Sequence, residues 1–378
     1  MKKIAFLNTS IGWGGLELNT IKLAKAFVEK GWEIALVTAE GSKMFEEGKE
    51  CFSTSLFLQK TKKYFDFSNA KKIAVFLKAE GYDGVFMTDN RDIDLANWAK
   101  RIYFKELKVF YQQQMQMAIR KKDILHTLRY KSIDAWISPL SWLKNQVVEQ
   151  TKFPEERISV IPLCVESDRY TKSKFSKIGA RKELEINPKG MLLGIIGRID
   201  PQKGQRFVTD AFIELRKQGV EVELLIFGSP TLNEEASKQY YDGIKELIAE
   251  NGVEKFVHFR KFSPQPELFY SAVDVFTIAS LSETFGMVTV EAMLSKLPIL
   301  AANTGGSPEI LRFGKFGQLF EYENVKDFCS KFNWVVNNPE KVKKMVEASQ
   351  AYALEKFDIS VEVDGIESLF MKHLPHVS

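Results

Sequence analysis

The sequence predicts an α/β protein built from two doubly wound, Rossmann-like domains that face a cleft, and three observations support this. The chain has 378 residues, whereas one domain typically holds ~100 to 200. Short apolar runs alternate with helical patterns along the chain, which is typical of parallel β-sheets. The alternation lapses over residues 166–190, a polar, lysine-rich stretch that we interpret as a link between two domains.

Each domain is expected to contain its own series of strands. In the first series the apolar runs predict strands at 3–8, 33–39, 84–89, 108–112, 135–138 and 158–163. In the second series they predict strands at 191–197, 222–228, 257–262, 275–280 and 298–303. Between the first two strands, the segment "GLELNTIKLAKAFVEKG" has apolar residues at helical spacing and ends at Gly31, so it completes one βαβ unit.

These elements predict domains at residues 1–170 and 171–355. The last segment, residues 356–378, contains the amphipathic stretch "SVEVDGIESLFMKHL" and is predicted to be a helix.

Composition limits the class of protein. Hydrophobic residues at 45% and charged residues at 27% are ordinary for a globular protein. No run approaches the ~18 apolar residues of a membrane helix. The three cysteines are scattered and odd in number, which favours a reducing cytoplasm, and Cys164 is interpreted as a packed small residue.

The net charge of +4 is unevenly spread, because basic residues exceed acidic ones in the first half of the chain and not in the second. This favours either an anionic partner or simply a solvated, lysine-rich surface. Lysines 60, 62 and 63 beside Tyr64 and Phe65, and the segment 120–123, are the features most like a contact with a membrane or an acceptor. Nucleic acid is not expected, since no helix-turn-helix or aromatic platform accompanies the charge.

Two loops that follow predicted strands carry features of a phosphate site. The segment "SIGWGGLE" places Gly14 and Gly15 before a helix, where exposed amides and the helix dipole favour an anion, although a tight turn without a ligand is an equal alternative. In "GRIDPQKG", Arg198 and Lys203 lie five residues apart on a turn that contains Pro201 and Gly204. Both cations are therefore expected to converge on one anion.

Two further loops belong to the second domain. In "SETFGMVTVEAML", Glu283 lies in a loop and Glu291 on the following helix, a span suited to a ligand with hydroxyls at both ends and phosphates between. The amides of residues 285–288 would face those phosphates. The segment "NTGGSPE" has a glycine pair before a helix, with Pro308 suited to its first turn, and is as consistent with a structural turn as with a ligand site.

Together the segments "GGLE", "GRIDPQKG", "ETFGMVTVE" and "GGSPEI" resemble the family 4 retaining glycosyltransferases of the GT-B architecture. The resemblance covers most of the chain and is most specific over "LFYSAVDVFTIASLSETFGMVTVEAMLSKLPILAANTGGSPEI". It implies an acceptor-side first domain, a nucleotide-sugar-binding second domain and a final helix that crosses back to the first domain.

The resemblance also implies roles for single residues. Arg198 and Lys203 would hold the donor diphosphate and stabilise the charge of the leaving phosphate, and Glu283 would face the transferred sugar. The remaining donor-binding residues implied are Gly14, Gly15, Phe285, Gly286, Met287, Val288, Thr289 and Glu291, the last of which would hold the ribose hydroxyls.

The sequence departs from the family pattern after the fourth expected strand. Many relatives have a histidine there, whereas this chain offers Gln112, Gln113 and Gln114 as contacts for the acceptor or sugar. A glutamine can bond a hydroxyl but does not titrate near neutral pH.

Asp92 and Asp94 imitate the metal-binding Asp-x-Asp of another glycosyltransferase fold. We interpret them as a solvated helix start and expect no metal and no cofactor.

The function that follows is a retaining, metal-independent, hexosyl-type glycosyltransferase (EC 2.4). It would move a sugar from a UDP- or GDP-type donor to a glycan or lipid-linked acceptor, in the synthesis of cell-surface polysaccharide or lipopolysaccharide. It would be cytoplasmic, with a contact to the inner face of the membrane through the basic first domain. A sugar-nucleotide epimerase and a nucleotide-sugar-binding protein without turnover stay open as alternatives.

Overall fold

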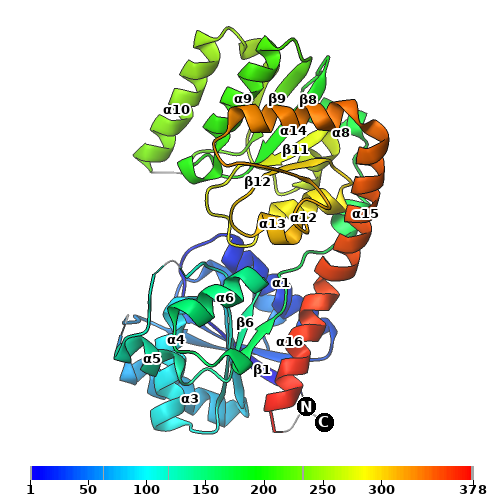
Figure 1. Ribbon diagram of the computed structural model, residues 1–378. Helices are drawn as coiled ribbons and strands as arrows, with labels where there is room; N and C mark the ends of the chain where they lie inside the picture. Colours follow the sequence, from blue (N-terminus) through cyan, green and yellow to red (C-terminus); the bar gives the residue numbers. More distant parts are fainter. Residues whose placement is uncertain (1, 63, 118, 232–233, 376–378) are drawn as a thin grey trace. The chain divides into compact units, whose positions relative to one another are not determined.

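The computed structural model describes residues 2–62, 64–117, 119–231 and 234–375 (Figure 1). These residues form two compact units. Unit 1 comprises residues 1–163 together with 359–378, and unit 2 comprises residues 164–358. The sequence places the corresponding limits at residues 170 and 355.

Unit 1 contains a seven-stranded sheet with the order β3-β2-β1-β4-β5-β6-β7, and all of its pairs are parallel. Six strands match the predicted segments, and β3 lies where no strand is predicted. Residues of β3 are largely half-buried, since it is an edge strand, so it lacks the continuous apolar run of its neighbours. The strands are β1 (Lys3–Asn8), β2 (Glu33–Ala39), β3 (Thr54–Leu58), β4 (Gly84–Met87), β5 (Lys108–Gln112), β6 (Ala135–Ser138) and β7 (Ile158–Val160).

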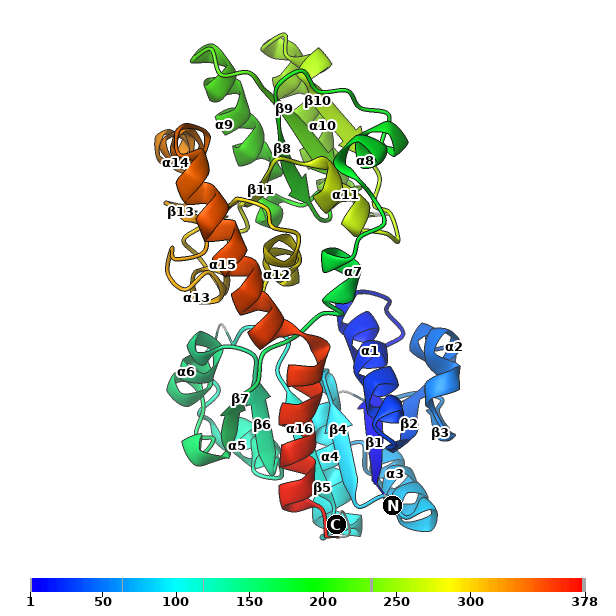
Figure 2. The same cartoon turned by 90° about the vertical axis from the view of Figure 1, so that its right-hand side faces the viewer.

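Helices cover both faces of this sheet. Figure 2 shows α1 and α16 over β1, β4 and β5, where Phe370 of α16 packs against Phe27, Phe86 and Phe110. Side chains from α3, α4 and α6 cover the other face. The helices are α1 (Gly15–Glu29), α2 (Lys43–Gly48), α3 (Phe67–Glu80), α4 (Ile93–Trp98), α5 (Ile124–Tyr130), α6 (Ser141–Gln150) and α16 (Ile359–His373).

Unit 2 contains a six-stranded parallel sheet with the order β10-β9-β8-β11-β12-β13. Five strands match predicted segments, and the three-residue β13 is too short to give a periodic signal. The strands are β8 (Met191–Ile196), β9 (Val222–Phe227), β10 (Val257–Arg260), β11 (Val275–Ile278), β12 (Ile299–Ala302) and β13 (Gln318–Phe320).

The helices of unit 2 also lie on both faces. Side chains from α9, α10, α14 and α15 share one core with the sheet, while Phe269 of α11 packs from the other side on Phe227 and Phe276. The helices are α7 (Asp168–Thr171), α8 (Lys177–Glu183), α9 (Gln205–Lys217), α10 (Glu235–Glu250), α11 (Glu267–Ala272), α12 (Met287–Leu294), α13 (Ser307–Ile310), α14 (Val325–Asn337) and α15 (Pro339–Phe357).

The interpretation of residues 166–190 as a link is wrong. This stretch contains α7 and α8 and belongs to unit 2. Tyr170, Ala180, Leu184 and Ile186 bury their side chains there, and Arg181 is paired with Asp274 at 2.7 Å. Four apolar anchors within a polar, lysine-rich sequence are too widely spaced to show as a periodic pattern.

The three cysteines, Cys51, Cys164 and Cys329, are buried, which agrees with the interpretation of Cys164 as a packed small residue. Among the described residues, no helix has the length and apolar character needed to cross a membrane.

Candidate functional site

Two loops of unit 2 with predicted site residues lie at the carboxyl ends of neighbouring strands of its sheet. β8 and β11 are parallel neighbours in the sheet but are not consecutive in the sequence. Strands are added on one side of β8 up to β10 and on its other side from β11, so the strand order reverses between β8 and β11. Open α/β sheets bind ligands outside the carboxyl ends of the strands at such a switch point. The loop after β8 carries Arg198 and Lys203, and the loop after β11 carries Glu283.

The loop after β8 is held against the end of β11. Its backbone turns at Gly204, where φ is +75° and a Cβ would lie 2.3 Å from the Ala279 carbonyl oxygen, so only glycine fits. The Leu281 amide donates to the Gln202 carbonyl at 3.0 Å, and the Asp200 side chain accepts from the Gln202 amide. These bonds fix Lys203 beside the loop that carries Glu283.

Lys203 and Glu283 form an ion pair, with 2.7 Å between Nζ and Oε2. Their side chains are 31% and 19% exposed, so the pair is partly shielded and still open to a ligand. A cation and a carboxylate side by side could contact a phosphate and a sugar hydroxyl of one ligand at the same time. The structure therefore brings together two of the three residues predicted to be catalytic.

Arg198, the third of these residues, is exposed. Its carbonyl accepts a hydrogen bond of 2.7 Å from the Gln205 side-chain amide, which fixes its backbone. Convergence of the Arg198 guanidinium with Lys203 on one anion stays a prediction.

The predicted "NTGGSPE" loop supports the loop of Glu283 from behind. The Gly306 amide donates to the Glu283 carbonyl at 2.9 Å. At Gly305, φ is +61° and a Cβ would lie 2.4 Å from the same carbonyl oxygen, so a side chain would push the two loops apart. The Thr304 hydroxyl adds a bond of 2.8 Å to the Ser280 carbonyl. The glycine pair is therefore explained here by close backbone packing.

The segment between the two glutamates begins helix α12 at Met287, with Gly286 as the N-cap residue. Phe285 anchors this turn, since its side chain is buried and packs edge-on against Phe357. The first amides of a helix have no partner within the helix and can face an anion, as predicted for residues 285–288.

Thr289 stays a predicted donor-binding residue, although its side chain is fully buried and its amide donates to the Gly286 carbonyl at 2.8 Å. Its hydroxyl oxygen has no hydrogen-bond partner among the described residues. Because a threonine in a helix start reads as polar and exposed in the sequence, its burial could not be anticipated.

Glu291 is half-buried on α12 and contacts tyrosines that the sequence did not single out. The Tyr270 hydroxyl donates to Glu291 Oε2 at 2.7 Å. The Tyr170 hydroxyl is also hydrogen-bonded to Glu291, and burial followed by the charge of this carboxylate raises the pKa of Tyr170. A signal was present in "LFYSAV", where Tyr270 is the one hydroxyl-bearing ring in an apolar helix.

Unit 1 has its own switch point between β1 and β4. Gly14 caps α1 and Gly15 begins it, and the chain at Gly14 is extended. Beneath this loop lies Glu17, which is 6% exposed. A Cβ at Gly14 would lie 3.7 Å from Glu17 Oε2, so the loop packs closely over this carboxylate.

Asp92 and Asp94 are not a solvated helix start, and that interpretation is wrong. Asp92 is fully buried and accepts hydrogen bonds from the Thr9 hydroxyl at 2.5 Å and the Thr9 amide at 3.2 Å. Burial and the nearby Asp89 raise the pKa of Asp92 to about 7. Asp94 is paired with Arg129 at 3.1 Å. No metal-binding cluster of His, Cys, Asp or Glu occurs among the described residues.

The structure also argues against Gln112 and Gln113 as ligand contacts. Gln112 is fully buried and donates to Glu362 of α16 at 2.7 Å. Gln113 is 1% exposed, and its Oε1 accepts from Trp136 and Ser138. The first two glutamines therefore face the core, whereas the prediction places all three beside the acceptor or sugar.

Gln114 is the half-buried member of the three. Its Nε2 is buried and has no hydrogen-bond partner among the described residues. It keeps the role of predicted contact.

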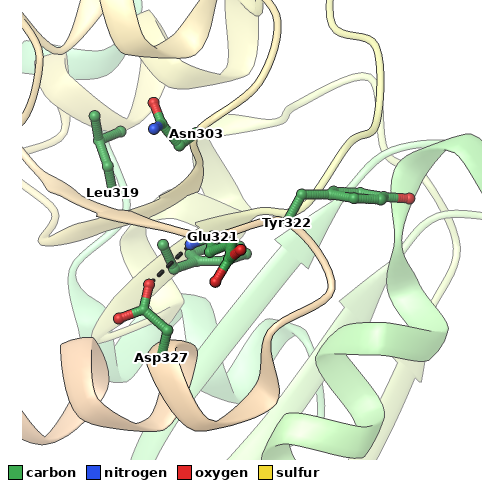
Figure 3. A pocket seen from close by; sticks show the side chains of 6 residues that line it. Asn303, Leu319, Glu321, Tyr322 and Asp327 are labelled. Atoms are coloured by element: carbon green, nitrogen blue, oxygen red, sulfur yellow. Dashed lines mark hydrogen bonds between the residues drawn. The ribbon is translucent and has the colours of Figure 1, made fainter.

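A hollow of about 470 Å³ lies past the ends of β12 and β13 (Figure 3). Its two carboxylates are Glu321, directly after β13, and Asp327, in the first turn of α14. Asp327 Oδ2 accepts from the Glu321 amide at 2.8 Å, and the Glu321 side chain accepts from Asn324. Negative charge here does not suit a diphosphate, and none of the predicted site residues lines the hollow. Its lining residues are Asn303, Leu319, Phe320, Glu321, Tyr322 and Asp327.

Known proteins match the chain in sequence. Residues 13–169 match the family described as Glycosyltransferase Family 4, and residues 176–352 match Glycosyl transferases group 1. The D-inositol 3-phosphate glycosyltransferase of Nocardia farcinica is 31% identical over 213 residues, which are 55% of this chain and 46% of that protein. The chain spans about half the length of the curated relatives it matches.

Solved structures share the fold. The glycosyltransferase of Rickettsia africae ESF-5 has a TM-score of 0.88 at 18% identity, covering 100% of this chain and 99% of that one. The Anabaena protein HepE in complex with UDP has a TM-score of 0.84 at 20% identity, covering 98% and 99%. Two Rossmann-like α/β units, the GT-B fold and the two sequence matches lead to one conclusion: the chain belongs to the family 4 glycosyltransferases.

Proposed function

We propose that the protein is a retaining, metal-independent glycosyltransferase that uses a nucleotide diphosphate sugar as its donor. The observation that carries the proposal is the Lys203–Glu283 ion pair at the switch point of unit 2. Glu291 lies on α12, the helix that follows the loop of Glu283. The sugar, the diphosphate and the ribose of such a donor would then each have a partner, in Glu283, Lys203 and Glu291 respectively.

Each group has a role in this proposal. Lys203 and Arg198 hold the diphosphate and stabilise the negative charge that grows on it as the sugar leaves. Glu283 bonds the sugar hydroxyls, and the amides of Phe285, Gly286, Met287 and Val288 face the phosphates. Gly14 and Gly15 of unit 1 approach the diphosphate in the closed enzyme.

UDP is the first nucleotide to consider, because HepE is solved with UDP and with UDP-glucose. The hexosyl donor, UDP- or GDP-linked, is the only co-substrate proposed, and neither a metal nor a cofactor is required. The acceptor proposed is a glycan or lipid-linked glycan of cell-surface polysaccharide or lipopolysaccharide synthesis in the cytoplasm.

A membrane contact through unit 1 is part of the proposal. Ile119, Ile124 and Leu125 are 66%, 75% and 66% exposed, and they flank Arg120 and the segment 121–123. Apolar side chains beside basic ones suit the surface of an anionic membrane. A second exposed group, Tyr64 and Phe65 with Lys60 and Lys62, has the same character, while Lys63 lies outside the described residues.

Donor turnover separates the proposal from its alternatives. Purified protein is incubated with UDP-glucose and other UDP- and GDP-sugars, and the released nucleoside diphosphate and any new sugar are measured. Release that falls sharply in Lys203→Ala and Glu283→Ala supports transfer or donor hydrolysis at this site. Binding without release in the wild type indicates a binding protein, and a changed sugar still attached to its nucleotide indicates an epimerase.

A further inference from the structure

Two buried tyrosines converge on the carboxylate of Glu291. The Tyr270 hydroxyl donates to Oε2 at 2.7 Å, and Tyr170 is hydrogen-bonded to the same side chain. Tyr270 is 2% exposed and Tyr170 is 7% exposed. Their rings lie edge to face, with 5.7 Å between the ring centres.

The direction of these hydrogen bonds follows from the chemistry of the groups. Burial raises the pKa of both tyrosines, so the phenols keep their protons. A protonated phenol donates and a carboxylate only accepts, so both hydroxyls point their hydrogens at Glu291. Burying a hydroxyl without a partner is costly, and this arrangement satisfies two hydroxyls with one side chain.

The three residues come from three different helices that are fixed to one another. Tyr170 lies on α7, Tyr270 on α11 and Glu291 on α12. Arg169 of α7 forms an ion pair with Glu267 of α11 at 2.8 Å. The Tyr270 oxygen also lies 3.4 Å from the Val288 carbonyl in the first turn of α12. The two hydroxyls therefore belong to helices other than the one that bears Glu291, and these helices are packed against it.

We infer that Tyr170 and Tyr270 are positioning residues, which hold the Glu291 carboxylate in the orientation that bonds the ribose hydroxyls of the donor nucleotide. This inference rests on the proposed function in assigning the ribose to Glu291. A glutamate has three rotatable bonds, and fixing it before the ligand arrives lowers the entropy lost on binding. A carboxylate accepts about four hydrogen bonds, so two tyrosines use only part of its capacity.

The inference makes the tyrosines determinants of specificity for ribose over deoxyribose. Without them, Glu291 can still carry its charge, but it must be oriented by the nucleotide itself. Affinity for a nucleotide that has both ribose hydroxyls should then fall, while affinity for a 2′,3′-dideoxynucleotide, which offers Glu291 nothing to bond, should not change.

The test measures the dissociation constants of UDP and 2′,3′-dideoxy-UDP by titration calorimetry for the wild type, Tyr270→Phe and Tyr170→Phe. Loss of one hydrogen bond to a charged group predicts about tenfold weaker UDP binding in each variant, with dideoxy-UDP unchanged. The matched control is Tyr82→Phe, which removes an equally buried hydroxyl bonded to Glu33 in unit 1, at 3.0 Å, and should leave both constants unchanged.

Each other outcome overturns the inference. Unchanged UDP binding means that the tyrosines do not orient Glu291, and equal losses for both nucleotides mean that they only support the fold. Tyr170→Phe gives a second measurement if Tyr270→Phe unfolds. If the wild type binds neither UDP nor GDP, the proposed function fails as well, and that failure is recognised before any variant is compared.

Discussion

At the scale of single residues, Lys203 and Glu283 are the most informative pair in the protein. They are 80 positions apart in the sequence and 2.7 Å apart in the structure. Their ion pair gives the site a defined charge arrangement before any donor binds. In the proposed function, an entering diphosphate would therefore share Lys203 with Glu283, and the carboxylate proposed to bond the sugar would already lie beside the cation proposed to bind the phosphate.

Replacing Lys203 by alanine should lower kcat by about 100-fold, because a cation aimed at developing negative charge acts mainly in the transition state. The measurement is release of nucleoside diphosphate from the best donor at saturating concentration. Lys326→Ala, at an exposed position on α14, is the control and should keep full activity. A Lys203→Ala variant as active as this control would remove Lys203 from the catalytic residues.

Asp92 predicts a pH effect on stability. Its pKa is about 7 in the folded protein and near 3.8 in the unfolded chain. Between these two pH values, the Asp92 carboxyl is protonated in the folded state and ionised in the unfolded state. The contribution of Asp92 to stability is fully present below about pH 4 and is lost as the pH rises through about 7. The total change is at most about 4 kcal/mol for this one group.

Urea unfolding at a series of pH values from 4 to 8 measures this effect. The free energy of unfolding of the wild type should decline with pH relative to that of Asp92→Asn, which does not titrate. Parallel curves for the two proteins would show that Asp92 is ionised, and compensated, throughout the range.

At the scale of elements, glycines in the loops at the sheet edge allow these loops to pack closely against one another. Gly305→Ala combines a positive φ with a Cβ only 2.4 Å from the Glu283 carbonyl oxygen. Gly219→Ala is the matched control, since its φ is +82° but no atom lies within 4 Å of its Cβ. We expect Gly219→Ala to lose about 1 kcal/mol of stability, and Gly305→Ala to lose more and to bind donor more weakly.

The melting temperature and the donor dissociation constant of these two variants provide the measurement. The difference between them isolates the contact with Glu283 from the strain of the backbone. Equal stability losses, with donor binding retained in both, would show that the loop of Glu283 tolerates displacement.

The sequence predicted the central strands of both sheets well, and it predicted less of what lies around them. Buried parallel strands such as β1 and β8 are continuous apolar runs, and this signal depends on nothing else in the chain. Edge strand β3 has too short an apolar run to stand out. The helices α7 and α8 depend on contacts with distant segments, so their sequences look polar. The same reason explains Asp92 and Thr289, which are polar side chains buried by tertiary packing.

For the candidate site, the motifs predicted where residues gather but not how they pair. Resemblance to the family drew attention to Lys203, Glu283 and Glu291, and the Lys203–Glu283 contact is a finding of the structure. Tyr170 lay in a segment interpreted as a link, so its contact with Glu291 could not be predicted. Gln112 and Gln113 were interpreted from their position after a strand, and their core partners come from elsewhere in unit 1.

At the scale of the whole molecule, the last helix, α16, supplies part of the hydrophobic core of unit 1. Phe370 of α16 is fully buried against Phe27, Phe86 and Phe110. Phe370→Ala should destabilise unit 1 by about 3–5 kcal/mol, as is usual when a buried aromatic side chain is removed. Met371→Ala, next to it but 39% exposed, should cost much less.

Urea unfolding followed by tryptophan fluorescence measures this difference, because Trp32 packs directly against Phe370. A transition that moves to lower urea in Phe370→Ala but not in Met371→Ala is expected. If both variants unfold like the wild type, α16 is an accessory to unit 1 and not part of its core.

The return of the chain to unit 1 also has a consequence for its biosynthesis. A ribosome finishes residue 163 and must then make the remaining residues of the chain before α16 is available. At ~5–20 residues per second this takes roughly 10 to 40 seconds. During that interval α1 covers only part of the apolar face around Phe86 and Phe110, so the nascent first unit exposes apolar side chains that a chaperone could bind until α16 has been made.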